Sequence, residues 1–217
     1  MTNDQLIKKT IAFVKAELSQ AEGGNDWFHI ERVYKNSLLI SKTEEVDNLV
    51  LVLGALLHDI ADSKFHDGDE TIGPKKAKEF LESQNVSAEV IEHSIKIIEN
   101  ISYKGGNKVQ RFFSKELAVV QDADRLDAIG AIGIARCFNY GGFKNRKLFD
   151  PEIKPNLTMS PEEYKASTAP TINHFYEKLL LLKDLMNTDT GKQLAEERHQ
   201  YMKGFLDQFY GEWKGEK

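Results

Sequence analysis

The chain has 217 residues, of which 41% are hydrophobic and 29% are charged, and this balance is typical of a globular protein with a buried core. The length suits one domain, and we expect a single domain over residues 1–217. The formal net charge of −5 argues against broad, non-specific binding to nucleic acid polymers or anionic membranes. The single cysteine, Cys137, excludes an intrachain disulfide and argues against a cysteine-based zinc site; its apolar neighbours indicate a buried side chain.

The N-terminal residues 3–20 place apolar side chains at helical spacing, which predicts a first helix that ends near Gly23. The segment lacks the apolar core and the small-residue cleavage site of a signal peptide. No apolar run in the chain approaches the roughly 18 residues of a membrane-spanning helix. We therefore expect a cytoplasmic protein without a membrane-spanning segment.

The rest of the first half is predicted to be helical, with two polar interruptions. Asn25 and Asp26 offer an N-cap for a helix that carries His29 in its first turn. Residues 63–73 are a polar loop, and residues 102–114 hold Lys104 and other basic residues without an acidic one. Apolar periodicity predicts four helices in this half, over about 26–42, 45–60, 74–84 and 88–101.

The second half is predicted to hold three helices and one long connection over residues 139–159, which are rich in Gly, Lys, Asn and Pro. The helices are expected from Ser114 to about 138, from a capping box at Ser160 to about 187, and over about 190–212. No alternating strand pattern extends beyond a few residues. The prediction is an all-α chain of about eight helices, with a core over about 22–138 and C-terminal accessory helices over about 160–212.

The strongest functional pattern is an apolar run that ends in a histidine–aspartate pair, VLVLGALLHDIAD at residues 50–62. Helical spacing buries the leucines and leaves His58, Asp59 and Asp62 at the end of the helix. An imidazole and carboxylates there are costly to bury unless a metal ion or a charge partner takes them up. Taken alone, the pattern fits a cap or a solvated helix end better than a site, but His29 and Asp124 occur in comparable settings on two other predicted helices.

Two imidazoles and two carboxylates on three separate helices form a mixed nitrogen and oxygen donor set. That set suits one divalent ion, with manganese in first place and magnesium, nickel, cobalt, iron or zinc as alternatives. Such a site leaves coordination positions for water and for a phosphoryl oxygen, as a catalytic metal requires. The four candidate ligands are His29, His58, Asp59 and Asp124.

The order His…His-Asp…Asp resembles the HD-domain superfamily of metal-dependent phosphohydrolases. The flanking residues resemble the bacterial subfamily that includes the YpgQ-type and YedJ-type proteins, and the resemblance covers about residues 5–210. It is carried by HIERV at 29–33, ALLHDIAD at 55–62, DADRLDAIGAIGIAR at 122–136 and INHFYEKLLLLKDLMNTDTGK at 172–192.

The resemblance implies an all-α fold with an HD-domain core of five helices and additional N- and C-terminal helices. It implies that the four candidate ligands above hold the metal. Asp124 is preferred to Asp122 because related proteins place the ligand in an Ala-Asp-x-Leu setting; Asp122 and Asp127 are then supporting or structural residues. Asp62 falls where several relatives have an acidic residue that handles the attacking water, although a hydrogen bond to a helix end or to Arg32 is the alternative.

Three basic residues are candidates for binding phosphate oxygens, since phosphoryl transfer needs positive charge around the leaving group. Lys104 lies in the Gly-rich basic stretch. Arg125 and Arg32 each have a structural salt bridge as the alternative role. The remaining histidines match no ligand spacing and are expected to be surface or hydrogen-bonded residues: His93, His174 and His199.

The resemblance implies a phosphohydrolase that acts on nucleotides, and the subfamily implies conversion of nucleoside triphosphates to monophosphate and pyrophosphate. A phosphomonoesterase or a phosphodiesterase on the same metal site is the nearest alternative. A non-catalytic, nucleotide-binding regulatory protein is the alternative of a different class. The expected partner is a small phosphorylated molecule rather than a nucleic acid polymer or a membrane, and a homo-oligomer is possible.

Overall fold

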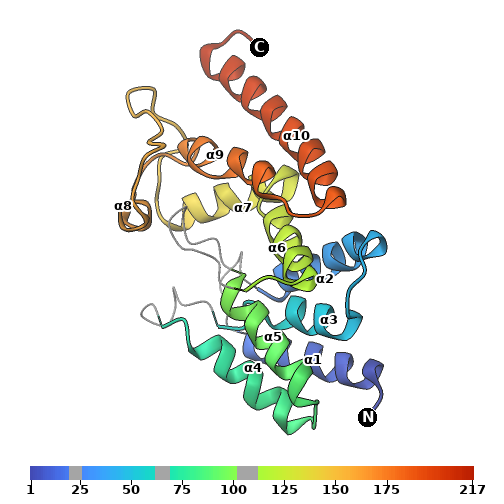
Figure 1. The fold of residues 1–217 in the computed structure, drawn as a ribbon. Coiled ribbons are helices and arrows are strands. Elements are labelled where there is room, and N and C mark those ends of the chain that lie inside the picture. Colours follow the sequence, from blue (N-terminus) through green and yellow to red (C-terminus); the bar gives the residue numbers. More distant parts are fainter. Residues whose placement is uncertain (20–25, 62–68, 102–111) are drawn as a thin grey trace. The chain divides into compact units, whose positions relative to one another are not determined.

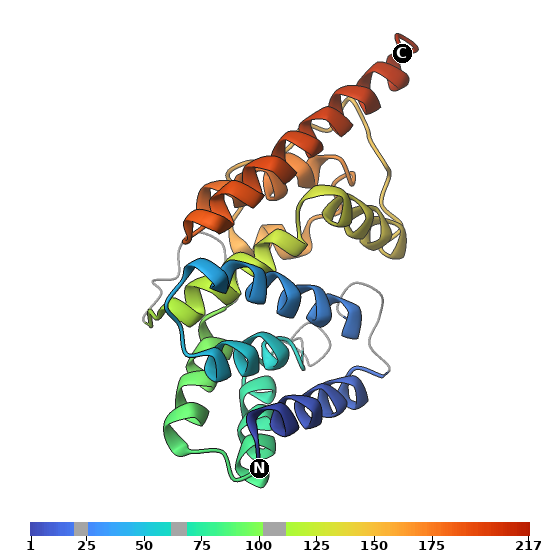
Figure 2. The same cartoon turned by 90° about the vertical axis from the view of Figure 1, so that its right-hand side faces the viewer.

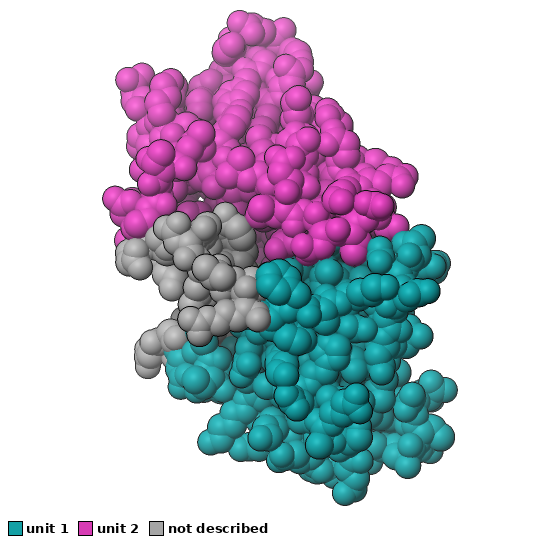
Figure 3. Space-filling model, viewed as in Figure 1, with its two compact units in different colours: residues 1–123 teal, residues 124–217 magenta. Residues whose placement is uncertain are grey.

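A computed structural model describes residues 1–19, 26–61, 69–101 and 112–217. These residues form helices, turns and irregular segments, with no strand among them, which confirms the all-α prediction (Figure 1). They divide into two compact units, Met1–Ala123 and Asp124–Lys217, coloured separately in Figure 3. The expectation of a single domain over the whole chain stays a prediction.

Unit 1 is built around one strongly apolar helix, α3 (Asn48–Leu57), whose residues 50–57 are all buried. Helices α1, α2 and α5 pack against it. Each leucine buried in this way contributes about 1.5–3 kcal/mol relative to an exposed one, so the burial of α3 contributes strongly to the stability of the unit. The remaining helices of the unit are α1 (Asn3–Glu17), α2 (Trp27–Ile40), α4 (Ile72–Ser83), α5 (Ala88–Asn100) and the first part of α6 (Lys115–Asp127).

Side-chain caps set where the helices of unit 1 begin. The carboxylate of Asp26 accepts the backbone N–H of His29 at 3.1 Å, and the Ser114 hydroxyl accepts that of Leu117 at 3.1 Å, which confirms both predicted caps. Helix α3 begins at Asn48 rather than near residue 45. The reason is that the Asp47 carboxylate caps it, accepting two backbone N–H groups at 2.8 and 3.1 Å.

Unit 2 contains the end of α6 and five further helical segments. The longest of these is α10, seen from the side in Figure 2. No helix within the described ranges is long and apolar enough to cross a membrane. The segments are α7 (Gly130–Phe143), α8 (Pro161–Ala166), α9 (Asn173–Glu177), the 3-10 helix η3 (Leu179–Leu185) and α10 (Asp189–Lys214).

The prediction of one helix from Ser114 to about 138 is wrong. Helix α6 ends at Asp127, and α7 starts at Gly130, whose φ of 74° lies in the left-handed region that glycine favours. The Arg198 side chain, which comes from α10, donates a hydrogen bond to the Leu126 carbonyl at the end of α6. A contact with a distant helix therefore satisfies one of the carbonyls that the break leaves without an intrahelical partner.

The prediction of one long helix from Ser160 to about 187 is also wrong, although its start is correct. Ser160 and Glu163 form the expected capping box, with reciprocal bonds of 3.1 and 2.7 Å. The helix ends at Ala166, and Pro170 follows before α9. Proline lacks the N–H of an interior helical residue and disfavours helix in the residue before it, so one regular helix through residue 170 is disfavoured.

We expect Gly130→Ala to lower the free energy of unfolding by about 1–2 kcal/mol, because a Cβ at this φ is strained and would lie 2.9 Å from the Arg198 Cγ. Gly204→Ala is the matched control: a Cβ there meets nothing within 4 Å in the middle of α10. It should raise stability by about 0.5–1 kcal/mol. Urea unfolding followed by circular dichroism measures both, and equal stability of Gly130→Ala and the unaltered protein would contradict the account of the break.

Candidate metal centre

The first candidate ligand, His29, lies in the first turn of α2. The cap by Asp26 fixes the start of this helix through the His29 backbone N–H. The side chain is 2% exposed and is followed by the fully buried Ile30. An imidazole in this position has lost nearly all contact with water and needs polar partners from the protein or from a ligand.

The second candidate ligand, His58, directly follows the buried helix α3. Its Nδ1–H donates to the Ala55 carbonyl, 2.9 Å away, and Nε2 is the second polar atom of the ring. That Nε2 lies 3.2 Å from the Nε2 of His29, with the ring centroids 5.2 Å apart and the planes at 71°. Metal-binding histidines commonly use one ring nitrogen as a donor to a carbonyl and the other as the ligand, and the bond from His58 to Ala55 fits this pattern.

The third candidate ligand, Asp59, is half-buried beside the two imidazoles. One carboxylate oxygen of Asp59 and one nitrogen from each ring all lie within 4.8 Å of one another. Two nitrogens that bind one ion at about 2.1 Å, with an angle of about 90–110° between them, are separated by about 3.0–3.4 Å. The observed 3.2 Å between His29 and His58 fits that requirement, and the mixed nitrogen and oxygen donors suit a divalent transition ion or magnesium.

The fourth predicted ligand, Asp124, is a half-buried residue of α6 and the first residue of unit 2. Its role as a ligand stays a prediction. Asp127, one turn later, is almost fully buried and forms an ion pair with Arg136 at 2.6 Å. This pairing supports the structural role that was predicted for Asp127.

The other predicted site residues lie in different surroundings. Arg32 lies half-buried on α2, one turn after His29. Arg125 donates from Nη1 to the Leu185 carbonyl at 2.5 Å, a contact that stabilises unit 2. Their roles in substrate binding stay predictions. Asp62 and Lys104 lie outside the residues that the structure describes.

Cys137 is buried on α7, as the sequence indicated. Burial raises the pKa of its thiol to about 12, while nearby Arg146 and Lys178 act in the opposite direction. The group is therefore a thiol rather than a thiolate at neutral pH. This excludes Cys137 from a role as an activated nucleophile.

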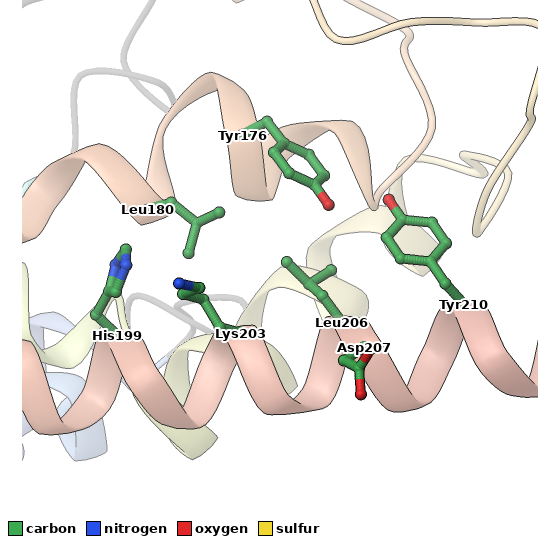
Figure 4. Close-up of a pocket in the computed structure, with 7 residues that line it drawn as sticks. All are labelled: Tyr176, Leu180, His199, Lys203, Leu206, Asp207 and Tyr210. Atoms are coloured by element: carbon green, nitrogen blue, oxygen red, sulfur yellow. The ribbon is translucent and has the colours of Figure 1, made fainter. Parts of the chain in front are cut away.

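Unit 2 also carries an open groove of about 400 Å³ between the α9–η3 segment and α10 (Figure 4). His199 and Lys203 project into it from α10, toward Leu180. The carboxylate at its edge, Asp207, is already bound by Lys217 at 2.5 Å. With one imidazole and one paired carboxylate, the groove does not assemble a ligand set comparable with that of unit 1.

His93, which the sequence left without a role, belongs to a polar network of unit 1. Its Nε2 lies 2.9 Å from the Ser114 hydroxyl and 3.4 Å from the Glu116 carboxylate. Glu116 in turn accepts the backbone N–H of Asp47 at 2.7 Å. The network links α5 and α6 to the residue that caps α3. This confirms that His93 is a hydrogen-bonded histidine.

Comparisons with known proteins give one consistent family. The sequence profile described as "HD domain" matches residues 27–129, which include α2, α3, α4, α5 and α6. The YpgQ protein of Bacillus subtilis strain 168 is 36% identical over 197 residues, covering 90% of this chain and 88% of YpgQ.

Solved structures agree over nearly the whole chain. The crystal structure of an HD-superfamily hydrolase from Bacillus thuringiensis is 45% identical, with a TM-score of 0.79, and the match covers 98% of this chain and 99% of that one. The crystal structure of Bacillus subtilis YpgQ in complex with ADP is 32% identical, with a TM-score of 0.78 and coverage of 98% and 97%. The helical arrangement described above is thus similar to that of these proteins.

We expect His58→Ala to weaken the binding of Mn²⁺ by at least about 10- to 100-fold, because it removes one of the two facing ring nitrogens. Isothermal titration calorimetry of the full chain measures the affinity. His199→Gln is the control, since His199 lies in unit 2 and outside the cluster. Equal Mn²⁺ affinity in His58→Ala and His199→Gln would exclude the cluster as the metal site.

Proposed function

This chain belongs to the HD domain family of hydrolases, and on that premise we propose that it is a metal-dependent phosphohydrolase acting on nucleotides. The observation that carries the proposal is the pair of buried imidazole nitrogens 3.2 Å apart, with the Asp59 carboxylate beside them. Two imidazole nitrogens at this distance share either one hydrogen or one cation, and the carboxylate of Asp59 beside them favours a cation. The family supplies the class of reaction in which such a cation is used.

The proposed ligands are His29, His58, Asp59 and Asp124. A divalent ion held by them would supply Lewis-acid polarisation of a phosphoryl oxygen and would lower the pKa of a water molecule. The orientation of His58 by the Ala55 carbonyl keeps its ligand nitrogen aimed at His29 before any substrate arrives. This orientation supports the proposal, because a catalytic site has to be held in place in advance.

The proposed reaction is hydrolysis of a nucleoside triphosphate at its α-phosphorus. A water molecule, oriented by Asp62, attacks this phosphorus, and Asp62 accepts the proton that the water loses. The bond between the α-phosphorus and the oxygen that bridges to the β-phosphorus breaks. Nucleoside monophosphate and pyrophosphate are released, and the leaving charge is stabilised by the basic residues Arg32, Lys104 and Arg125.

Two findings support a nucleotide as the substrate. The YpgQ protein, whose match covers nearly all of this chain, has a crystal structure in complex with ADP. The donor set of the centre is also of the nitrogen and oxygen type that binds manganese and magnesium, the ions that accompany phosphate groups. Manganese as the preferred ion and a cytoplasmic location remain part of the proposal.

We expect the purified chain with Mn²⁺ to release pyrophosphate from nucleoside triphosphates, and chelator to abolish the release. The measurement is product analysis on a panel of triphosphates, monophosphates and cyclic dinucleotides with Mn²⁺, Mg²⁺, Ni²⁺ or Co²⁺. Release of inorganic phosphate alone would replace the proposed reaction with that of a phosphomonoesterase. Monophosphate released from a dinucleotide without pyrophosphate would identify a phosphodiesterase, and equilibrium binding of nucleotide without turnover would favour the regulatory protein.

We expect Asp124→Ala to lose Mn²⁺ binding and hydrolysis together while the helical circular dichroism spectrum stays unchanged, because only a ligand carboxylate is removed. Asp127→Asn, one turn away on α6, is the comparison. It breaks the buried ion pair with Arg136 and should lower thermal stability while metal binding is kept. The assignment of Asp124 fails if its alanine variant binds Mn²⁺ as tightly as the unaltered chain.

A further inference from the structure

Unit 2 contains a groove that the proposed reaction does not use. It lies between the α9–η3 segment and α10 and has a volume of about 400 Å³ (Figure 4). Its residues on α10 are three or four positions apart, so they share one face of the helix. From His199 to Tyr210 this face is about 16 Å long, at about 1.5 Å of rise per residue. The groove is therefore elongated along α10.

The middle of the groove and one of its ends are apolar and aromatic. Leu206 projects into it from α10 and is 4% exposed, and Leu180 projects toward it from η3 (Figure 4). At the end of the groove, the hydroxyls of Tyr176 and Tyr210 face each other. Burial and the hydrogen bond with Tyr176 raise the pKa of Tyr210. Because the two hydroxyls satisfy each other, an apolar body can lie along this part of the groove without leaving them unpaired.

The other end of the groove carries a positive charge on Lys203. Its ammonium group points toward His199, one turn earlier on α10 (Figure 4). Among the described residues, Lys203 forms no ion pair. The carboxylate one turn further along the helix, Asp207, is bound by Lys217 at 2.5 Å instead. The ammonium group is therefore available to an anion, and its aliphatic stem extends the apolar surface of the groove.

The neighbouring charges at this end contact one another rather than Lys203. Lys183, on η3, lies 2.9 Å from the Glu196 carboxylate and 3.9 Å from that of Asp184. The Asp184 side chain is 73% exposed, so water screens most of its charge. Lys203 is thus the cation of this end that no carboxylate contacts, among the residues that the structure describes.

His199 supplies a second donor beside Lys203. Its Nδ1 is buried and has no hydrogen-bond partner within the described ranges. Burial is the main cause that lowers the pKa of this imidazole, so the ring is neutral at neutral pH and carries one hydrogen. A buried N–H without an acceptor is rarer in proteins than an unused lone pair, which places the hydrogen on Nε2. The Nε2–H can then donate to the anion that Lys203 attracts.

We propose that this groove binds a small organic anion that joins one carboxylate to an elongated apolar body, as a medium-chain fatty acid does. The carboxylate accepts hydrogen bonds from the Lys203 ammonium group and the His199 Nε2, and the body lies along Leu180, Leu206 and the tyrosine pair. One cation matches the single charge of a carboxylate, and a volume of about 400 Å³ lies in the range of small-molecule sites, about 300–1,000 Å³. The site belongs to unit 2 alone and is independent of the metal centre of the proposed function.

The test is isothermal titration calorimetry of the full chain with sodium octanoate, in EDTA so that no metal ion contributes. Octanoate should bind about 10- to 100-fold more tightly than butyrate, at a factor of about 2–3 for each of the four additional CH₂ groups. Lys203→Met, which keeps the apolar stem, should weaken octanoate binding by about 10- to 100-fold, the loss typical of a hydrogen bond to a charged group. Lys192→Met is the matched control, because this exposed lysine of α10 is paired with Asp189 at 3.2 Å; its affinity should equal that of the unaltered chain.

The contrary outcomes are distinct. Absence of octanoate binding by the unaltered chain, or equal affinity in Lys203→Met and Lys192→Met, overturns the site. Octanol bound as tightly as octanoate excludes an anion as the ligand, and butyrate bound as tightly as octanoate excludes the apolar body. If Lys203→Met loses helical circular dichroism, His199→Leu, which removes the second donor, decides the question by the same titration. A dimer in sedimentation velocity that Lys203→Met dissociates would assign the groove to a second copy of the chain instead.

Discussion

The burial of α3 is the constraint on which the candidate centre depends. Residues 50–57 are all inside the core of unit 1. The polar side chains that follow this run along the chain are those at the C-terminal end of the helix. His58 is still only 8% exposed there, so its ring needs partners on both nitrogens. The Ala55 carbonyl satisfies one nitrogen, and the other is directed at His29 from a neighbouring helix. The candidate metal centre thus lies at the point where the apolar run stops.

Much of the fold of unit 1 could be predicted from the sequence, because local signals there agree with the packing. Apolar periodicity and the caps Asp26 and Ser114 place the helices within a few residues of their observed bounds. In unit 2 the interactions that set the helix bounds join residues that are distant in sequence. The break after Asp127 depends on a left-handed glycine together with Arg198 from α10, and neither interrupts the apolar period that suggested one helix. Pro170, by contrast, is a local signal in the sequence, because a proline disfavours one long helix through residue 170.

The candidate site, like the fold, could be predicted from the sequence where local signals position its residues. Three of the four predicted ligands meet because a buried helix and a capped helix position them, and both features are visible in the sequence. The contact of Arg146 with the Ser167 carbonyl could not have been predicted, because it depends on a turn with a left-handed asparagine and on a backbone pairing between Lys147 and Thr171. A loop and the short helix α8 separate these residues in sequence, and no spacing rule relates them.

The single cysteine gives unit 2 a built-in reporter of its own motions. Cys137 is buried, and its thiol keeps its proton because burial raises the pKa to about 12. A thiol reagent added to the folded chain can therefore react at an appreciable rate only when α7 transiently separates from the segment around Thr171. The labelling rate then measures the free energy of local opening in unit 2. No engineered probe is needed, because the chain has no other cysteine that would contribute to the signal.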